Sequence, residues 1–429
     1  MEQMSVVLNS MKKHETFYSI NIEEKIQQPD LLFELPRTPD PTIVEYLANV
    51  TDIDGKKYLE QCTSQVRVYA KPNGQWMLQA RDLDGNPKSV GGDEFFVRYF
   101  GNVAAMQSDP YFNFDLDEVN DYAPCTAVAH VTDHKNGAYS LDFVRSPFAE
   151  DDWTNETVGG LLSVSLVYTN GIGRVTRPNK DKWETGGFLF KNFNEWNMTV
   201  QPQIRDFVAP VYDLKQYNQV ICYGDSLMMN FCGSVGGKHE APEVTFQMKN
   251  IVPQKGNKGY LIRSDTIDEG LEWLETWYGD DLRKAEKGIS TALILGSAAW
   301  ELMSNEGPEP GHNFEDSIRM YRILVERARE MYPNVTVLWK SPQAVHLHLL
   351  GEHCMLVIPL KCGNRIRYMS NELVKYLHDE QQKVMASLSV PYLNIWETTY
   401  LSPDTHMHDD ARHYRMWPNE LMMKFFYPQ

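Results

Sequence analysis

An apolar run from Gln219 to Tyr223 ends in the tetrapeptide Gly224-Asp225-Ser226-Leu227. Such a run is typical of a buried β-strand, and Gly, Asp and Ser are common residues where a helix begins. In α/β domains a junction of this kind lies at the carboxyl edge of a parallel sheet. The pattern therefore predicts that Ser226 lies at the start of a helix, whose free N–H groups can stabilise a developing negative charge.

Helical and strand patterns alternate from about residue 214 onwards. Three stripes of apolar residues recur at spacings of three, four or seven, which indicates helices with one buried face, and an apolar strand follows each stripe. Repeated helix-then-strand units predict a parallel sheet covered on both faces, with functional residues after the strand ends. The stripes are Ile267, Leu271, Leu274 and Tyr278; Phe314, Ile318, Tyr321, Val325 and Ala328; and Leu373, Leu377, Val384 and Leu388, and the strands are Thr291–Leu295, Val335–Trp339 and Pro391–Trp396.

Short alternating runs separated by turn residues occupy the region from about Ser64 to Val175. Regularly spaced short strands with Asp-Gly and Asn-Gly turns predict an all-β sandwich of the immunoglobulin type. The runs are Gln65–Ala70, Trp76–Ala80, Ala138–Phe143 and Leu162–Val167, and the turns are Asp84–Pro87, Gly91–Asp93 and Lys135–Gly137.

The composition bounds the class of protein. With 429 residues, of which 42% are hydrophobic and 12% aromatic, the chain can form two or three globular domains. The net charge of −17 argues against nucleic acid or an anionic membrane surface as a partner, because such binding needs clustered Lys and Arg. No run reaches the about 18 to 20 apolar residues of a membrane span. Residues 1–30 contain no apolar core of a signal peptide, so we expect a cytoplasmic chain on sequence alone.

The cysteines are too sparse for a disulfide scaffold, and their spacing matches no zinc pattern. We expect mostly free, buried thiols, with the two cysteines that flank Ser226 filling small spaces in the core. The six cysteines are Cys62, Cys125, Cys222, Cys232, Cys354 and Cys362.

Ser226 needs a base before it can act as a nucleophile. Near the other end of the chain, Asp410 and His413 lie three residues apart, so both side chains can face the same way from a turn. We predict that His413 is the general base and that Asp410 orients its ring and stabilises the imidazolium. The alternative is that Ser226 only caps the helix.

A second hypothesis concerns the residues just before this pair. Asp404, His406, His408 and Asp409 crowd the same loop, and imidazole and carboxylate groups are also metal ligands. We favour the serine mechanism, with no metal, because the strand-to-helix junction at Ser226 supports it independently.

Gly-Asp-Ser-Leu early in the domain and Asp-x-x-His late in it resemble the SGNH (GDSL-type) esterases and acyltransferases. The resemblance implies a three-layer α/β fold and an oxyanion hole made of the serine N–H, a Gly N–H and an Asn side chain. At the expected place for the Asn, Gly296–Leu302 resembles the Asn-Ser-x-x-Trp-Asp-Leu phrase of PC-esterases, with Gly296 in place of the Asn.

Other donors must then complete the oxyanion hole. We expect the N–H of Gly296 or Ser297, or the Ser297 hydroxyl, to substitute. Gly233 is a further candidate in a loop after the serine helix, although a glycine there is also an ordinary helix C-cap. Since loss of one oxyanion donor costs about 10²–10³ in rate, an attenuated or inactive enzyme is an open alternative.

Two phrases in the β region, Ala80–Pro87 with Gly91–Asp93 and Val131–Tyr139, resemble filamin-type immunoglobulin repeats. In such repeats the Asn-Gly-x-Tyr element closes a hairpin and buries its tyrosine. A filamin-like sandwich followed by this α/β domain resembles the neurexophilin and PC-esterase (NXPE) family, from about Ser64 to the C-terminus. The resemblance implies O-acyl chemistry on glycans, in proteins that usually enter the secretory pathway.

We therefore predict an irregular lead-in over residues 1–60, a filamin/immunoglobulin-like β-sandwich over 61–178, a connector over 179–213 and an SGNH-like α/β domain over 214–429. The predicted function is transfer of an acetyl group to or from glycan hydroxyls through an acyl-enzyme on Ser226. O-acetyl transfer is slightly favoured, with acetyl-CoA as a donor and no bound cofactor. The alternatives are a carbohydrate or lipid acyl esterase and a catalytically silent adhesion or ligand protein.

Overall fold

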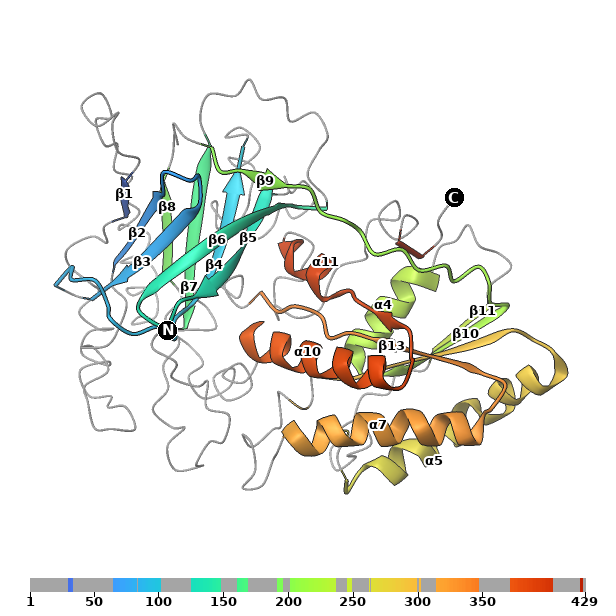
Figure 1. The fold of residues 1–429 in the computed structure, drawn as a ribbon. Helices are drawn as coiled ribbons and strands as arrows, with labels where there is room; N and C mark the ends of the chain where they lie inside the picture. The colour runs from blue at the N-terminus through green and yellow to red at the C-terminus, as the bar shows by residue number, and fades with distance from the viewer. Residues whose placement is uncertain are drawn as a thin grey trace, which may run out of the picture. The chain divides into compact units, whose positions relative to one another are not determined.

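Two compact units, Met1–Phe207 and Val208–Gln429, make up the computed structural model (Figure 1). The regular elements described in the first unit are β-strands, and those in the second are a parallel sheet and helices. The structure describes residues 30–33, 65–82, 84–101, 125–147, 160–168, 191–195, 201–236, 245–248, 262, 264–298, 301, 314–346, 371–403 and 425–426.

Nine strands of the described part of the first unit share one sheet, in the order β1-β2-β3-β6-β5-β4-β7-β8, with β9 beside β6. Neighbours pair antiparallel, except that β9 runs parallel to β6. The strands are β1 (Asp30–Phe33), β2 (Gln65–Ala70), β3 (Trp76–Arg81), β4 (Glu94–Phe100), β5 (Ala127–Asp133), β6 (Ala138–Arg145), β7 (Leu161–Tyr168), β8 (Lys191–Glu195) and β9 (Ile204–Arg205).

The four strands predicted from alternation are confirmed as β2, β3, β6 and β7. Alternation succeeded there because these strands bury every second side chain on one face, as Val66 and Val68 do in β2. β4 was not among the runs named from the sequence, and its residues, Glu-Phe-Phe-Val-Arg-Tyr-Phe, do not alternate between apolar and polar. The described strands belong to one hydrogen-bonded sheet, whereas a sandwich has two separate sheets. The filamin- or immunoglobulin-like fold therefore stays a prediction.

The two filamin-like phrases contact each other. Tyr139 is fully buried, and its hydroxyl accepts the N–H of Asp93 at 3.1 Å and donates to the Asp93 carboxylate at 3.3 Å. Lys88 forms a buried ion pair with the same carboxylate at 2.9 Å. The N–H of Gly92 donates to Asp133, the residue that pairs with Tyr139 across the β5–β6 hairpin. The expected hairpin and buried tyrosine are confirmed, and these residues stabilise the fold.

Strands also occur in the segments predicted to lack regular structure. β1 lies in the lead-in of residues 1–60 and pairs with β2, and β8 and β9 lie in the connector of residues 179–213. Neither β8, which is Lys-Asn-Phe-Asn-Glu, nor the two-residue β9 carries an apolar alternation, so backbone pairing alone reveals them. The compact units divide after Phe207, within the predicted connector.

The second unit contains a parallel sheet of five described strands in the order β11-β10-β12-β13-β14. The three predicted helices and the first two strands that follow them are confirmed, and described residues of their apolar stripes lie in the buried core. The third predicted strand, Pro391–Trp396, is confirmed only at Tyr392–Leu393, because Trp396 begins a helix. None of the described helices is both long and apolar enough to cross a membrane. The strands are β10 (Gln219–Gly224), β11 (Thr245–Met248), β12 (Thr291–Gly296), β13 (Thr336–Lys340) and β14 (Tyr392–Leu393), and the helices are α4 (Ser226–Gly236), α5 (Ile267–Leu282), η4 (Arg283–Lys287), α7 (Phe314–Met331), α10 (Asn371–Ser387) and α11 (Trp396–Tyr400).

Helices cover both faces of this sheet (Figure 1). Side chains of α5, α7 and α10 share one core with Ile221 and Tyr223 of β10 and Trp339 of β13. Cys222 lies between Ile221 and Tyr223 and therefore points to the opposite face, where it is bonded to Cys232 of α4. Thus α4 packs on one face of the sheet, and α5, α7 and α10 pack on the other.

Candidate active site

The carboxyl ends of β10 and β12 form a topological switch point. From β10 the chain crosses to β11 on one side, whereas from β12 it crosses to β13 on the other. Open α/β sheets bind ligands where neighbouring connections diverge in this way. Gly224 and Gly296, the last residues of the two strands, are directly paired, and Ser226 and Ser297 follow them within two residues.

Gly224 and Gly296 lie so close to neighbouring backbone atoms that neither position has room for a Cβ atom. A Cβ atom on Gly224 would lie 2.5 Å from the carbonyl oxygen of Gly296. A Cβ on Gly296 would lie 2.9 Å from the carbonyl oxygen of Lys340 and 2.9 Å from Cε of Met228. Position 296 therefore has no room for the asparagine side chain that PC-esterases carry there.

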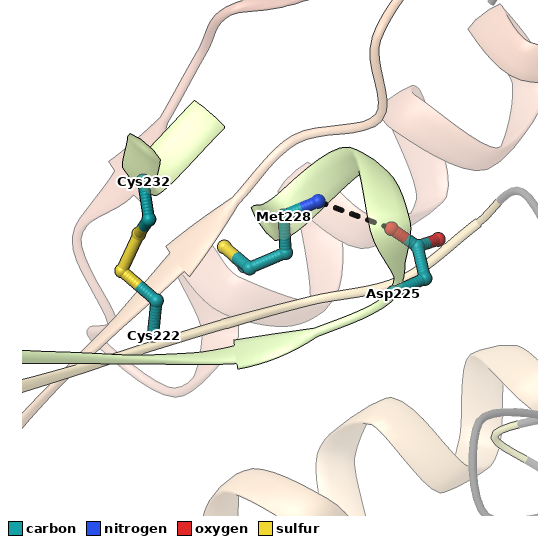
Figure 2. Close-up of a disulfide and its surroundings, with 4 residues drawn as sticks. All are labelled: Cys222, Asp225, Met228 and Cys232. Atoms are coloured by element: carbon teal, nitrogen blue, oxygen red, sulfur yellow. Dashed lines mark hydrogen bonds between the residues drawn. A yellow bond between two sulfur atoms is a disulfide. The ribbon is translucent and has the colours of Figure 1, made fainter. Parts of the chain in front are cut away.

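Asp225, and not Ser226, is the capping residue of α4. Its Oδ1 accepts the N–H of Met228 at 3.2 Å (Figure 2) and that of Leu227 at 3.0 Å. Its carbonyl accepts the N–H of Met229 at 3.1 Å. These are the contacts of an N-cap. Ser226 is the first residue of the helix, so the helix cap does not explain its presence.

A disulfide between Cys222 and Cys232 joins β10 to α4 (Figure 2). The expectation of free thiols is therefore wrong for this pair. The two Cα atoms lie 6.6 Å apart because α4 folds back over the strand that it follows, a proximity that cysteine spacing alone does not reveal. Gly233 lies inside α4, which continues to Gly236, and not in a loop after the helix.

A buried hydrogen-bond network holds the chain just after β12. The Ser297 hydroxyl donates to Oε1 of Glu301 at 2.5 Å, and the Tyr321 hydroxyl donates to the same oxygen at 3.3 Å. Gln381 of α10 donates to the Ser297 carbonyl at 2.7 Å and accepts the indole N–H of Trp339 at 2.9 Å. At most 5% of each residue is exposed. The Ser297 hydroxyl, a predicted oxyanion donor, already donates to Glu301.

Burial shifts the pKa of Glu301 and the pKa of Lys340, two side chains that also interact with the charge of Asp225. It raises the pKa of Glu301 to about 8, and the negative charge of Asp225 adds to this shift. Burial lowers the pKa of Lys340 to about 8, partly opposed by the same Asp225 charge. The Lys340 ammonium donates to the carbonyl of Ser341 at 3.0 Å and lies 5.8 Å from the ring centroid of Phe231. Glu301 lies within the phrase that resembles the PC-esterases, but neither Glu301 nor Gln381 was predicted to be a site residue.

The predicted base and its carboxylate, His413 and Asp410, lie outside the described residues, as does the alternative metal cluster Asp404, His406, His408 and Asp409. These assignments stay predictions. Within the described residues, no group of three His, Cys, Asp or Glu side chains is arranged to hold a metal ion.

No protein-family profile matches the chain, and a search of curated proteins finds no match. Among solved structures, a lipase/acylhydrolase from Enterococcus faecalis is 13% identical over 48% of this chain and 91% of its own, with a TM-score of 0.30. The acetyl xylan esterase AlAXEase is 13% identical over 48% of this chain and 98% of its own, with a TM-score of 0.29. At TM-scores this low, neither protein's activity carries over to this chain.

The substitution Glu301→Gln should remove a pH dependence of stability. Because the pKa of Glu301 is raised from 4.5 to about 8, the folded chain keeps a proton that the unfolded chain releases between these values. The stabilising contribution is complete below the unfolded pKa and is lost as the pH rises toward the folded one. Urea unfolding between about pH 5 and 8 should show wild type losing stability relative to Glu301→Gln. A difference that stays constant over this range would contradict the assignment.

Proposed function

We propose that this chain is a serine-dependent acyl-transfer enzyme of the SGNH (GDSL) type, with Ser226 as its nucleophile. One observation carries the proposal. Ser226 begins α4 at the switch point between β10 and β12, while Asp225 fills the capping position. A serine at this place can present its hydroxyl and its own N–H to one carbonyl group.

The mechanism is double displacement. The oxygen of Ser226 attacks the acyl carbonyl carbon while His413, held by Asp410, takes the proton of the Ser226 hydroxyl. His413 then gives this proton to the leaving group. A second hydroxyl, from a sugar or from water, then gives its proton to His413 and attacks the acyl-serine. His413 then passes this proton to the oxygen of Ser226 as the ester bond to the serine breaks. The N–H of Ser226, the first residue of α4, stabilises the negative charge of each tetrahedral intermediate.

Transfer and hydrolysis share the first of these displacements and differ only in the acceptor. We favour transfer of an acetyl group to a glycan hydroxyl, on the resemblance of the sequence to NXPE proteins, with acetyl-CoA as the first donor to test. A carbohydrate or lipid esterase is the alternative, in which water reaches the acyl-enzyme.

Ser226→Ala should abolish labelling by a fluorophosphonate probe, because the probe reacts with an activated serine. The free energy of unfolding should change by less than about 0.5 kcal/mol, the usual range away from a structural feature. Asp225→Ala should instead cost about 0.5–2 kcal/mol, since it removes the helix cap. Ser290→Ala, at the amino edge of the sheet, is the matched control and should label normally. Absence of labelling in folded wild type would favour the catalytically silent alternative.

His413→Ala and Asp410→Ala should each lower turnover of p-nitrophenyl acetate by about 10²–10⁴ if they are base and orienting carboxylate. His406→Ala and His408→Ala should leave turnover close to that of wild type. If His406→Ala or His408→Ala lowers turnover more than His413→Ala does, His413 is not the base. A stoichiometric metal in the purified protein would instead favour the metal site of Asp404, His406, His408 and Asp409.

Acetyl-CoA with a sialylated or neutral oligosaccharide should give an O-acetylated glycan by mass spectrometry. The product should be absent with Ser226→Ala, because both displacements pass through that serine. Release of acetate without glycan product, across several acceptors, would identify a hydrolase instead.

A further inference from the structure

The peptide that joins Ser297 to Ala298 has a defined orientation. Its carbonyl oxygen, on Ser297, accepts the side-chain N–H of Gln381 at 2.7 Å. In a planar trans peptide the carbonyl and the following N–H point in opposite directions, and no cis peptide occurs in the described residues. The N–H of Ala298 therefore points away from Gln381 and from α10.

This direction is toward the face of the sheet that carries Ser226. Gln381 belongs to α10, which packs with α5 and α7 on one face. The α4 helix, which begins at Ser226, packs on the other face, and Lys340 of β13 points there over Phe231. The N–H of Ala298 is thus directed to the α4 side, at the end of the strand that pairs with β10.

We infer that the backbone N–H of Ala298 is a catalytic oxyanion donor, held in place by Gln381, Ser297 and Glu301 as positioning residues. The inference rests on the proposed function, because it assigns a donor for the intermediate formed on Ser226. It supplies the second donor of the site, beside the N–H of Ser226 at the start of α4.

The other candidates on this strand are less suited to the role. The Ser297 hydroxyl donates to Glu301, within the buried network. Gly296 belongs to β12, paired on one side with Gly224, and has no room for a side-chain donor. The Ser297 N–H lies in the same peptide as the Gly296 carbonyl, which faces Gly224 of β10, so this N–H points away from β10. Ala298 is the next donor along the chain.

Two hydrogen bonds with buried side chains hold Ser297. Glu301 holds the side chain of Ser297, and Gln381 holds its carbonyl. Gln381 is itself fixed by the indole N–H of Trp339, a fully buried residue of β13. Because all three partners are buried, the peptide cannot rotate without leaving polar groups unpaired, which is costly in the interior. A donor preorganised in this way needs no rearrangement during the reaction.

The direct test replaces the amide N–H of Ala298 with an ester oxygen by nonsense suppression with lactic acid in the full chain. The side-chain methyl and the Ser297 carbonyl remain. We expect kcat for p-nitrophenyl acetate to fall by about 10²–10³ with little change in KM. The same ester at Ala386, within α10, is the control: it removes a helix hydrogen bond and should lower stability without lowering kcat.

Gln381→Met tests the positioning role and serves also if the ester-containing chain does not fold. It keeps the size of the side chain but frees the Ser297 carbonyl, so kcat should fall by about 10- to 10²-fold, with KM nearly constant. Gln382→Met is the matched control, because Gln382 is the next residue of α10 and is exposed. It should keep the wild-type kcat.

The outcomes separate this inference from the proposed function. If wild type is labelled at Ser226 and turns over the ester, but the Ala298 ester stays within threefold of wild type, the donor assignment is wrong and the proposed function stands. Ser297→Ala should lower kcat less than the Ala298 ester does, and the reverse order would give the role to the Ser297 hydroxyl. If wild type has no Ser226-dependent activity, the proposed function itself fails.

Discussion

Close backbone approach at Gly224 and Gly296 is the constraint on which the rest of the candidate site depends. The two residues are paired at the ends of β10 and β12, and a Cβ on either would meet another backbone carbonyl within 3 Å. This contact sets the start of α4 against the loop after β12. Ser226 and Ala298 each lie two residues beyond this contact, Ser226 at the start of α4 and Ala298 after β12.

Beneath that edge, burial sets the charge state of the ionisable side chains. Asp225 accepts helix N–H groups, while burial raises the pKa of Glu301 and lowers that of Lys340. With its pKa raised to about 8, Glu301 favours the protonated form near neutral pH. Burying the Glu301 carboxyl group costs desolvation free energy. The buried Glu301 also accepts the hydroxyl of Ser297 and so helps to hold this residue in place.

Strong periodicity accounts for what could be predicted. The stripes that became α5, α7 and α10 bury one face each, and the apolar runs after them became strands, because burial itself generates the pattern. Where polar residues interrupt an apolar run without alternating, as in β4, or where only backbone pairing defines a strand, as in β8, no periodic pattern marks the strand. The Cys222–Cys232 disulfide was not predicted, because the two cysteines come together only when α4 packs against β10.

The sequence by itself determined that Ser226 follows a buried strand and begins a helix, because strand burial and helix start depend on residues within a few positions of each other. It also determined the Asn-Gly-x-Tyr hairpin of the first unit. Only the tertiary structure decided that Asp225 is the cap, that Ser297 is bound by Glu301, and that Gln381 orients the following peptide. Gln381 lies 84 residues from Ser297, and no local pattern links them. Their contact exists because β12, β13 and α10 pack together, so the direction of the Ala298 N–H is a property of the assembled sheet.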